Sequence, residues 1–219
     1  MSKTSSIRCL ITAGPTREFL DPVRFISNPS TGKMGFALAQ SALDQGWTVD
    51  LVTGPVCLTE PEGVILYPVV SAEEMYHQVD ALFDVCDVFI MCAAVSDFRP
   101  LEYIPEKVKK EQAERSIQLA KTIDILKVMS QRKDKQCIVG FAAETNNLFE
   151  NAKHKLQSKA CDWIIANQIG EPGAGFASDT NSVTLFHKSG TETSLGPDTK
   201  ANIAAALIQT IAKELSHES

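Results

Sequence analysis

Short apolar runs that alternate with segments of helical periodicity constrain the fold of this chain more than any other feature. Six such runs read as strands, and they lie at residues 7–12, 48–53, 64–70, 88–92, 138–141 and 163–166. Helical spacing occurs within or across residues 21–46, 72–85, 123–131 and 147–159. Parallel strands need long crossover connections, so this alternation predicts a mainly parallel sheet covered by helices on both faces.

The C-terminal part of the chain departs from that alternation. Residues 182–186 and 191–195 flank Lys188-Ser189-Gly190 and predict a β-hairpin, and an amphipathic helix follows it. We therefore expect an α/β, Rossmann-like, three-layer fold with a C-terminal hairpin and helix. With 219 residues and no visible repeat or linker, the chain is expected to form a single domain over residues 1–219.

Composition narrows the classes of partner. The net charge of −6 argues against a nucleic-acid binder. No apolar run approaches the roughly 20 residues of a membrane span, and the N-terminus lacks an apolar signal core. The six cysteines form no C-x-x-C motif and show no metal-ligand spacing with the histidines, which favours buried, reduced thiols. The expected location is cytoplasmic.

Residues 21–46 are the best candidate for an anion site. A polar loop enters a helix here, and the first main-chain N–H groups of a helix have no intrahelical partner. Ser30-Thr31-Gly32-Lys33 is not a P-loop, because the required Gly and Ser/Thr positions hold Ser27 and Met34. Gly14-Pro15-Thr16 is not a G-x-G-x-x-G fingerprint either.

Several polar residues have both a structural and a functional interpretation. Arg24 could orient a carboxylate or pair with Asp21, and Asn28 could bind a ligand or cap a turn. Lys107, Lys109 and Lys110 lie in a segment, residues 101–122, that we expect to be an exposed, mobile flap because it offers little apolar area to bury. These lysines could be a solvated face or could close over phosphates.

The chain resembles phosphopantothenoylcysteine synthetase of coenzyme A biosynthesis along nearly its whole length. The matching segments are 11–17, 21–28, 30–35, 93–97, 107–110, 140–146, 162–167 and 176–181. In many bacteria this domain follows a flavin-dependent decarboxylase domain. The synthetase segments take up nearly all of this sequence, and the decarboxylase half is missing. The resemblance therefore implies a free-standing synthetase without flavin.

The resemblance implies a ligase that works in two steps. The carboxylate of 4′-phosphopantothenate attacks the α-phosphate of CTP, with Mg²⁺, and diphosphate leaves. The amine of cysteine then attacks the acyl-cytidylate, giving phosphopantothenoylcysteine and CMP. The resemblance also implies a homodimer with the site near its interface.

The same resemblance assigns roles to individual residues. It implies that Lys107 is the catalytic lysine of the first step and that Asn28 acts on the acyl intermediate. Substrate contacts are implied for Arg24, Asn28 and Ala94. Nucleotide contacts are implied for Ala93, Asp97, Lys107, Lys121, Asp124, Phe141, Lys155 and Lys159. The family pattern does not assign the ligands of the metal.

Two positions depart from the family pattern. Pro15 replaces a glycine, which removes one main-chain donor from the first turn. Lys121-Thr122-Ile123-Asp124 replaces Lys-Asn-Pro-Asp, which affects the loop on the nucleotide side. The alternative hypotheses are a Rossmann-like oxidoreductase that uses a flavin or nucleotide, and a nucleotide-binding module without catalysis. ATP is the alternative nucleotide.

Overall fold

The computed structural model describes residues 6–109, 116–144, 147–168 and 178–217. Its helices are α1 (Lys33–Asp44), α2 (Ala72–Phe83), α3 (Ile125–Gln131), α4 (Leu148–Ser158) and α5 (Lys200–His217). The strands of the main sheet are β1 (Arg8–Ala13), β4 (Thr48–Thr53), β5 (Ile65–Pro68), β6 (Val88–Met91), β9 (Cys137–Glu144), β10 (Trp163–Gln168), β11 (Thr180–His187) and β12 (Glu192–Thr199). Four short strands lie outside it: β2 (Arg17–Phe19), β3 (Phe25–Ser27), β7 (Phe98–Pro100) and β8 (Leu119–Lys121).

The main sheet has eight strands in the order β12-β11-β10-β9-β6-β1-β4-β5. Neighbouring strands in the part β10-β9-β6-β1-β4-β5 of this order are parallel. The antiparallel strands β11 and β12 form a hairpin beside β10. The strand order reverses between β1 and β6, which is the switch point where doubly wound folds bind ligands. The expected Rossmann-like fold, with its terminal hairpin and helix, is confirmed.

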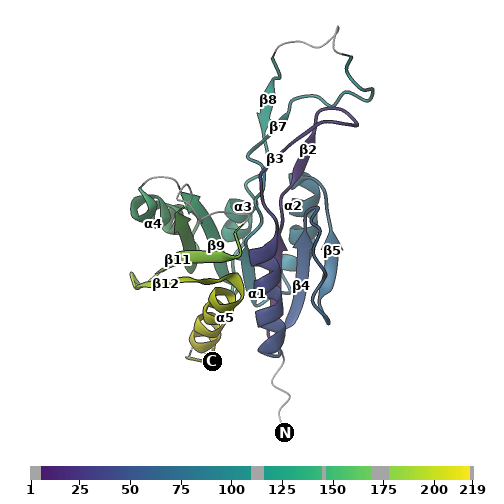
Figure 1. Cartoon of the computed structure of the whole chain (residues 1–219). Helices are drawn as coiled ribbons and strands as arrows, with labels where there is room; N and C mark the ends of the chain where they lie inside the picture. The colour runs from purple at the N-terminus through teal and green to yellow at the C-terminus, as the bar shows by residue number, and fades with distance from the viewer. Residues whose placement is uncertain (1–5, 110–115, 145–146, 169–177, 218–219) are drawn as a thin grey trace.

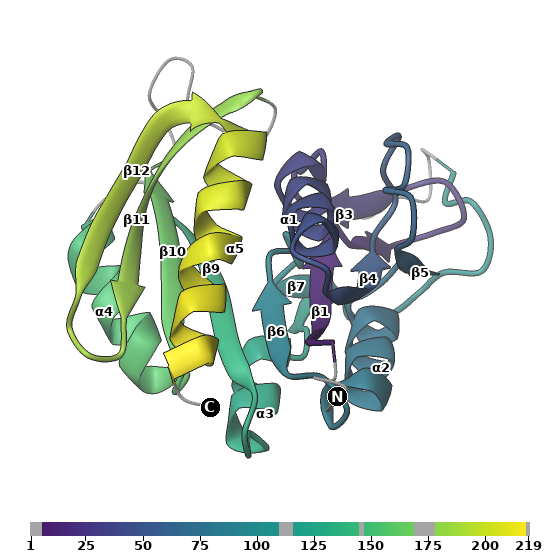
Figure 2. The same cartoon turned by 90° about the horizontal axis from the view of Figure 1, so that it is seen from below.

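Helices cover both faces of the sheet, which makes three layers (Figure 2). Alternation along β1 explains the arrangement: Cys9 and Ile11 pack under α1 and α5, and Leu10 packs on the opposite face with α2 and α3. Because both faces are buried, a central strand such as β6 is apolar throughout rather than alternating with polar residues.

Local signals place the ends of α1 and α2. Gly46, with φ of +78°, follows α1 and ends it, because glycine adopts this left-handed conformation readily. The Ser71 hydroxyl accepts a hydrogen bond of 3.1 Å from the Glu74 main-chain N–H, which makes Ser71 the N-cap of α2. In a capping box the Glu74 carboxylate would accept from the Ser71 N–H, but here it accepts from the Val70 N–H at 2.7 Å, one residue earlier.

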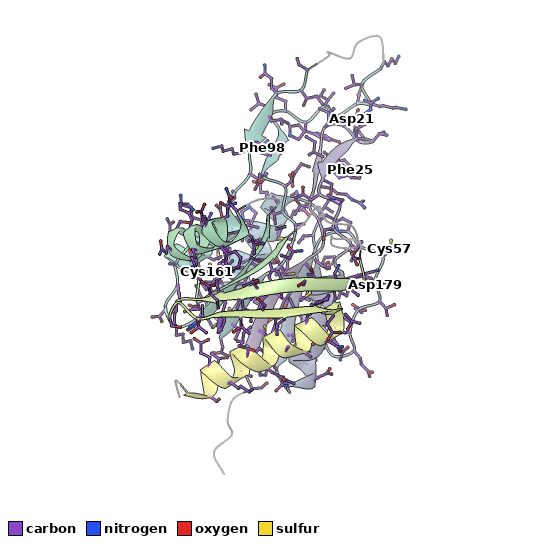
Figure 3. All side chains as sticks on the ribbon, turned by 60° about the vertical axis from the view of Figure 1, so that its left-hand side comes forward. Asp21, Phe25, Cys57, Phe98, Cys161 and Asp179 are labelled. Atoms are coloured by element: carbon purple, nitrogen blue, oxygen red, sulfur yellow. The ribbon has the colours of Figure 1, made fainter. Side chains whose placement is uncertain are left out.

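An arm rises from the carboxyl end of the sheet (Figure 1). We define it as residues 17–27 and the described part of 98–121; it contains the β2–β3 and β7–β8 ladders. A hydrogen bond of 2.9 Å from Ile104 N–H to Leu20 O joins its two halves. The expected exposure of the flap is confirmed for most of its described residues, 101–109 and 116–122, whereas the predicted irregular loop that begins at residue 21 contains the short strand β3. Figure 3 shows Asp21, Phe25 and Phe98 on this arm.

The six cysteines are all unpaired. Cys9, Cys86, Cys137 and Cys161 are buried, and burial raises the pKa of Cys86 and of Cys161 to about 12. The expectation of buried thiols is wrong for Cys57, which is exposed. None of the helices in the described part of the chain is long and apolar enough to cross a membrane.

Candidate active site

A cavity of about 710 Å³ lies at the carboxyl ends of the central strands, at the switch point between β1 and β6. Its walls come from the turns after β1 and β6, the N-terminal turn of α1, the loop before α3, and residues of β9, α4, β10, β11 and α5. The predicted site residues that line it are Asn28, Ala93, Ala94, Asp97, Lys121, Asp124, Phe141, Lys155 and Lys159. The structure therefore brings together nine residues that are spread over more than 130 positions of sequence.

The floor of the cavity is a close contact between the β1 and β6 turns. The Ala94 N–H donates to Gly14 O at 2.9 Å, and the Ala93 N–H donates to the Thr12 hydroxyl at 3.2 Å. Gly14 has φ of +73°, and a Cβ on it would lie 2.9 Å from a Val56 methyl group. The polar main chain of these turns is thus held against the cavity without side chains filling it.

Asn28 is fixed on this floor by its side-chain amide. Its Nδ2 donates hydrogen bonds to Ala94 O at 3.2 Å and to Val95 O at 3.0 Å. Asn28 follows β3 directly, so the base of the arm delivers this side chain to the turn after β6. Both amide hydrogens point at main-chain oxygens in this conformation.

One wall of the cavity carries three lysines and two aspartates, which are Lys121, Lys155, Lys159, Asp97 and Asp124. Lys155, on α4, donates to Phe141 O at 2.8 Å, and Lys159 forms an ion pair with Asp124. Asp124 is also the N-cap of α3, where it accepts from the Lys127 N–H at 3.0 Å. Burial alone would raise the pKa of Asp124, but the bonds from Lys159 and Lys127 outweigh burial and lower it. This carboxylate is therefore ionised at neutral pH and holds Lys159 at the cavity.

Arg24 and Lys107 lie on the arm and not among the residues that line the cavity. Arg24 pairs with Asp21 at 2.7 Å, as the structural alternative predicted, and also donates to Val108 O at 3.2 Å. Lys107 is exposed, beside this contact. Both residues thus belong to one hydrogen-bonded unit of the arm. Lys110, Thr145 and Asn146, which contributed to the sequence patterns, lie outside the described residues.

The opposite wall contains polar residues to which no role was assigned from sequence. They are Lys33, Asn167, Asn181 and Lys200, with Asp179 bonded to Lys33 at 2.5 Å. Lys33 opens α1 and Lys200 opens α5, and each is the first residue of a helix at the carboxyl edge of the sheet. In the sequence, a lysine at the start of each helix is the one signal that could have indicated these two residues. A structure was needed to join residues 33 and 200.

No group of three or more His, Cys, Asp or Glu side chains suited to a metal ion occurs among the described residues. Asp97 and Asp124 do line the cavity, and one or two carboxylates together with substrate phosphates are the usual ligands of Mg²⁺. The side chains present therefore fit a metal that is bound together with a phosphorylated substrate better than a metal held by protein alone.

The fold and the cavity define a doubly wound α/β protein with a cation-lined site at its switch point. The chain belongs to the family described as the DNA/pantothenate metabolism flavoprotein C-terminal domain, whose family model matches residues 4–215.

Individual relatives agree with this family. The chain is 45% identical over 204 residues to the coenzyme A biosynthesis bifunctional protein CoaBC of Bacillus subtilis, a match that covers 93% of this chain and 50% of that protein. The chain thus spans about half the length of the curated relatives it matches.

Solved structures agree as well. The crystal structure of the C-terminal domain of a CoaBC protein matches with a TM-score of 0.83 and 40% identity, over 96% of each chain. A Cab2 mutant in complex with phosphopantothenate-cysteine matches with a TM-score of 0.77 over 97% of this chain and 88% of that one. At 18% identity the latter shows a shared fold alone.

Proposed function

We propose that this chain is a phosphopantothenate–cysteine ligase of coenzyme A biosynthesis that uses CTP. The observation that carries the proposal is the gathering of Asn28, Asp97, Lys155 and Lys159 around one cavity at the switch point. The 45% identity to a coenzyme A biosynthesis protein supports the same conclusion. The reaction involves no change of oxidation state, so it needs no flavin.

In the first step, an oxygen of the phosphopantothenate carboxylate attacks the α-phosphorus of CTP. The bond from that phosphorus to the bridging oxygen breaks, and diphosphate leaves with the electron pair. We place the nucleotide against Ala93, Asp97, Phe141, Lys155 and Lys159, on the wall that also includes Lys121 and Asp124. Positive charge aimed at the transferring phosphoryl group lowers this barrier, and we assign that role to Lys107 of the arm.

In the second step, the cysteine amine attacks the acyl carbon, and the bond from that carbon to the CMP oxygen breaks. Asn28 is the residue we assign to the acyl intermediate, with Arg24 and Ala94 holding the pantothenate part. To donate to the acyl oxygen, the Asn28 amide exchanges one of its two main-chain acceptors, Ala94 O or Val95 O. A substrate that binds at Ala94 would offer its acyl oxygen to the Asn28 amide in place of Ala94 O.

Mg²⁺ enters this proposal as part of the CTP complex. It neutralises phosphate charge when bound, and Asp97 is the exposed carboxylate at the cavity that could hold it with the phosphates. Asp124 is already engaged by Lys159. The carboxylate supply of the site thus fits a metal whose remaining ligands come from the substrate.

We further infer that the protein has a single domain and works in the cytoplasm. We also infer that it forms a homodimer through the arm. Large apolar side chains are exposed along the arm, and Tyr103, for example, is 56% exposed. The exposed apolar residues of the arm are Val23, Phe25, Phe98, Leu101, Tyr103, Ile104, Ile117 and Leu119. Exposed apolar side chains gathered on one arm in this way favour a protein–protein interface. Light scattering after size-exclusion chromatography should give a dimer for the wild type and a monomer for Phe98→Asp.

An assay of diphosphate release tests the proposed function. Purified protein, Mg²⁺ and 4′-phosphopantothenate are incubated with CTP or ATP, with and without cysteine. We expect release with CTP that depends on phosphopantothenate, and CMP formation that depends on cysteine. Absence of release with both nucleotides would overturn the ligase assignment, and faster release with ATP would overturn the choice of CTP.

A further inference from the structure

Thr16 is a fully buried threonine at the root of the arm, immediately before β2. Its hydroxyl oxygen accepts a hydrogen bond of 3.0 Å from the Ser96 N–H, and its main-chain oxygen accepts one of 2.7 Å from the Ser27 hydroxyl. A buried hydroxyl costs free energy unless it is hydrogen-bonded. The contact with Ser96 therefore gives this threonine a specific structural task.

The two partners of Thr16 each precede a residue of the proposed active site. Ser27 ends β3 and is followed by Asn28, to which we assign the acyl intermediate. Ser96 is followed by Asp97, which we place at the nucleotide and its metal. Thr16 thus joins the segment that delivers Asn28 to the turn that delivers Asp97.

Thr122 holds the same turn from the other half of the arm. Its hydroxyl donates to Ser96 O at 2.6 Å, and its main-chain N–H donates to Asp97 O at 3.0 Å. Thr122 follows β8, lines the cavity and precedes Asp124, the N-cap of α3. It also lies in the loop where this sequence departs from the family pattern. In this chain, the threonine hydroxyl connects that loop to the turn after β6.

Ser96 is the residue at which these hydrogen bonds meet. Besides its bonds with Thr16 and Thr122, its hydroxyl donates to Phe98 O at 2.9 Å, and its side chain is buried. The N–H, the main-chain oxygen and the hydroxyl of Ser96 are thus all engaged, which favours one geometry of the turn. We call Thr16, Ser96 and Thr122 the hydroxyl cluster. It joins the roots of the β2–β3 and β7–β8 halves of the arm.

The first step of the proposed reaction depends on the relative placement of two substrates that different parts of the site hold. Asn28 lies at the acyl part, and Asp97 lies at the nucleotide. The carboxylate oxygen has to approach the α-phosphorus in line with the bond that breaks, and a misplacement of about 1 Å can cost roughly a hundredfold in rate. A fixed connection between the two residues therefore contributes to the rate.

We infer that Thr16, Ser96 and Thr122 are positioning residues, whose hydrogen bonds fix Asn28 and Asp97 at the relative placement that the first step needs. This inference rests on the proposed function. The hydroxyl cluster acts through Asn28 and Asp97 rather than on the reacting atoms. Because Thr122 also lines the cavity, its experiment has to distinguish positioning from a direct contact with the nucleotide.

Valine tests the hydroxyl cluster, because it keeps the β-branched shape of threonine and lacks the hydroxyl. We compare Thr16→Val and Thr122→Val with Thr16→Ser and Thr122→Ser, which keep it. Thr210→Val is the matched control, because the Thr210 hydroxyl also donates to a main-chain oxygen, Ala206 O at 2.8 Å, on α5. Thermal unfolding shows whether each variant folds. Thr122→Val carries the experiment if Thr16→Val does not fold, since Thr122 is only half-buried.

We expect both valine variants to lower kcat for diphosphate release about tenfold or more. The KM for CTP and for phosphopantothenate should stay within about twofold, since each substrate keeps its own contacts. The serine variants should restore most of kcat, and Thr210→Val should match the wild type. Unchanged kcat in the valine variants, or a loss that serine does not restore, would overturn the inference. A raised KM for CTP with normal kcat in Thr122→Val would make Thr122 a nucleotide contact and would overturn its positioning role.

Nuclear magnetic resonance gives a readout that does not depend on activity. Asn28 Nδ2 bonds Ala94 O and Val95 O, directly before Ser96, so a displaced turn changes the surroundings of this amide. We expect the Asn28 side-chain amide signals to shift in Thr16→Val and Thr122→Val and to stay in place in Thr210→Val. Unmoved signals in both variants would overturn the inference. The proposed function fails differently, because a wild type that releases no diphosphate would still show whether the hydroxyl cluster holds Asn28.

Discussion

The guanidinium group of Arg24 donates a hydrogen bond of 3.2 Å to the main-chain oxygen of Val108, the residue that follows Lys107. The Asp21 carboxylate completes the contact, since it accepts from Arg24 Nη1 at 2.7 Å and from the Val108 N–H at 3.3 Å. The β2–β3 half of the arm therefore holds the segment that carries Lys107. Substrate held by Arg24 would be linked to the position of the Lys107 ammonium.

Lys107→Gln should abolish the first step of the proposed reaction. Glutamine keeps a polar side chain but lacks the positive charge that stabilises the transferring phosphoryl group. We expect the rate of diphosphate release to fall at least a hundredfold. The KM for cysteine should stay unchanged, because cysteine enters only in the second step. Lys109→Gln, an exposed lysine two positions away, is the matched control and should keep near-normal activity. Equal losses in both variants would show that the segment supplies only general charge.

Asn28→Asp should slow the second step more than the first. The substitution removes the Nδ2 donor that now bonds Ala94 O and Val95 O, and places a carboxylate against those oxygens. We expect acyl-cytidylate to form and to persist, because its breakdown lacks a donor to the acyl oxygen. Rapid-quench assays with and without cysteine measure both steps. If the two steps slow by the same factor, the division of roles between Asn28 and Lys107 is wrong.

The parts of the fold that were predictable from sequence are those with a local cause. The strand at residues 48–53 has the bounds of β4, because a β-branched, apolar run ends there at Gly54-Pro55. β2 and β3 were not predictable, since each has three residues and their pairing depends on contacts across the arm. Short strands of this kind leave no periodicity to detect.

The candidate site divides in the same way. The family resemblance indicated Asn28 and Lys155, and the structure places both at the cavity. It did not indicate that Lys33, Asp179 and Lys200 meet, because 146 positions separate the two members of the Lys33–Asp179 ion pair. The sheet puts them together, because α1 begins at the carboxyl edge of the parallel strands and the antiparallel hairpin returns the start of β11 and the end of β12 to that same edge.

Lys155→Met should weaken the binding of CTP. Lys155 Nζ lies in the cavity wall, where it donates to Phe141 O at 2.8 Å, and one charged hydrogen bond from it to CTP would be worth about 1.5–3 kcal/mol. We therefore expect the KM for CTP to rise at least tenfold. The control is Lys153→Met on the same helix, whose exposed lysine pairs with Glu192 at 2.7 Å and does not line this cavity. An equal rise in both variants would mean that the net charge of α4, and not Lys155, governs nucleotide affinity.

Asp162→Asn should destabilise the fold through a buried charge that is remote from the cavity. Asp162 is 2% exposed and accepts hydrogen bonds from Lys133 Nζ at 2.5 Å, from Lys188 Nζ at 2.8 Å and from the Ile138 N–H at 2.8 Å. Asparagine keeps the size of the side chain but removes the charge that both lysines contact. We expect the free energy of unfolding at pH 7 to fall by about 2 kcal/mol, as measured by urea unfolding.

The pH dependence of that loss identifies its cause. Burial alone would raise the pKa of Asp162, but the bonds from Lys133, Lys188 and Ile138 hold it below its ordinary value of 3.8. A carboxyl whose pKa is lower in the folded state adds stability above the unfolded value, and this stability is lost as the pH falls through the folded value. The difference between wild type and Asp162→Asn should therefore shrink below about pH 4.

A surface aspartate provides the control for this prediction. The side chain of Asp84 is 74% exposed where it pairs with Arg132, so Asp84→Asn should change the free energy of unfolding by less than about 0.5 kcal/mol at either pH. A loss in Asp162→Asn that stays constant down to pH 3 would indicate altered packing. A loss that disappears with acid would show that the Asp162 charge itself joins β9, β10 and the β11–β12 turn, because its partners Ile138 and Lys188 lie on or beside those elements.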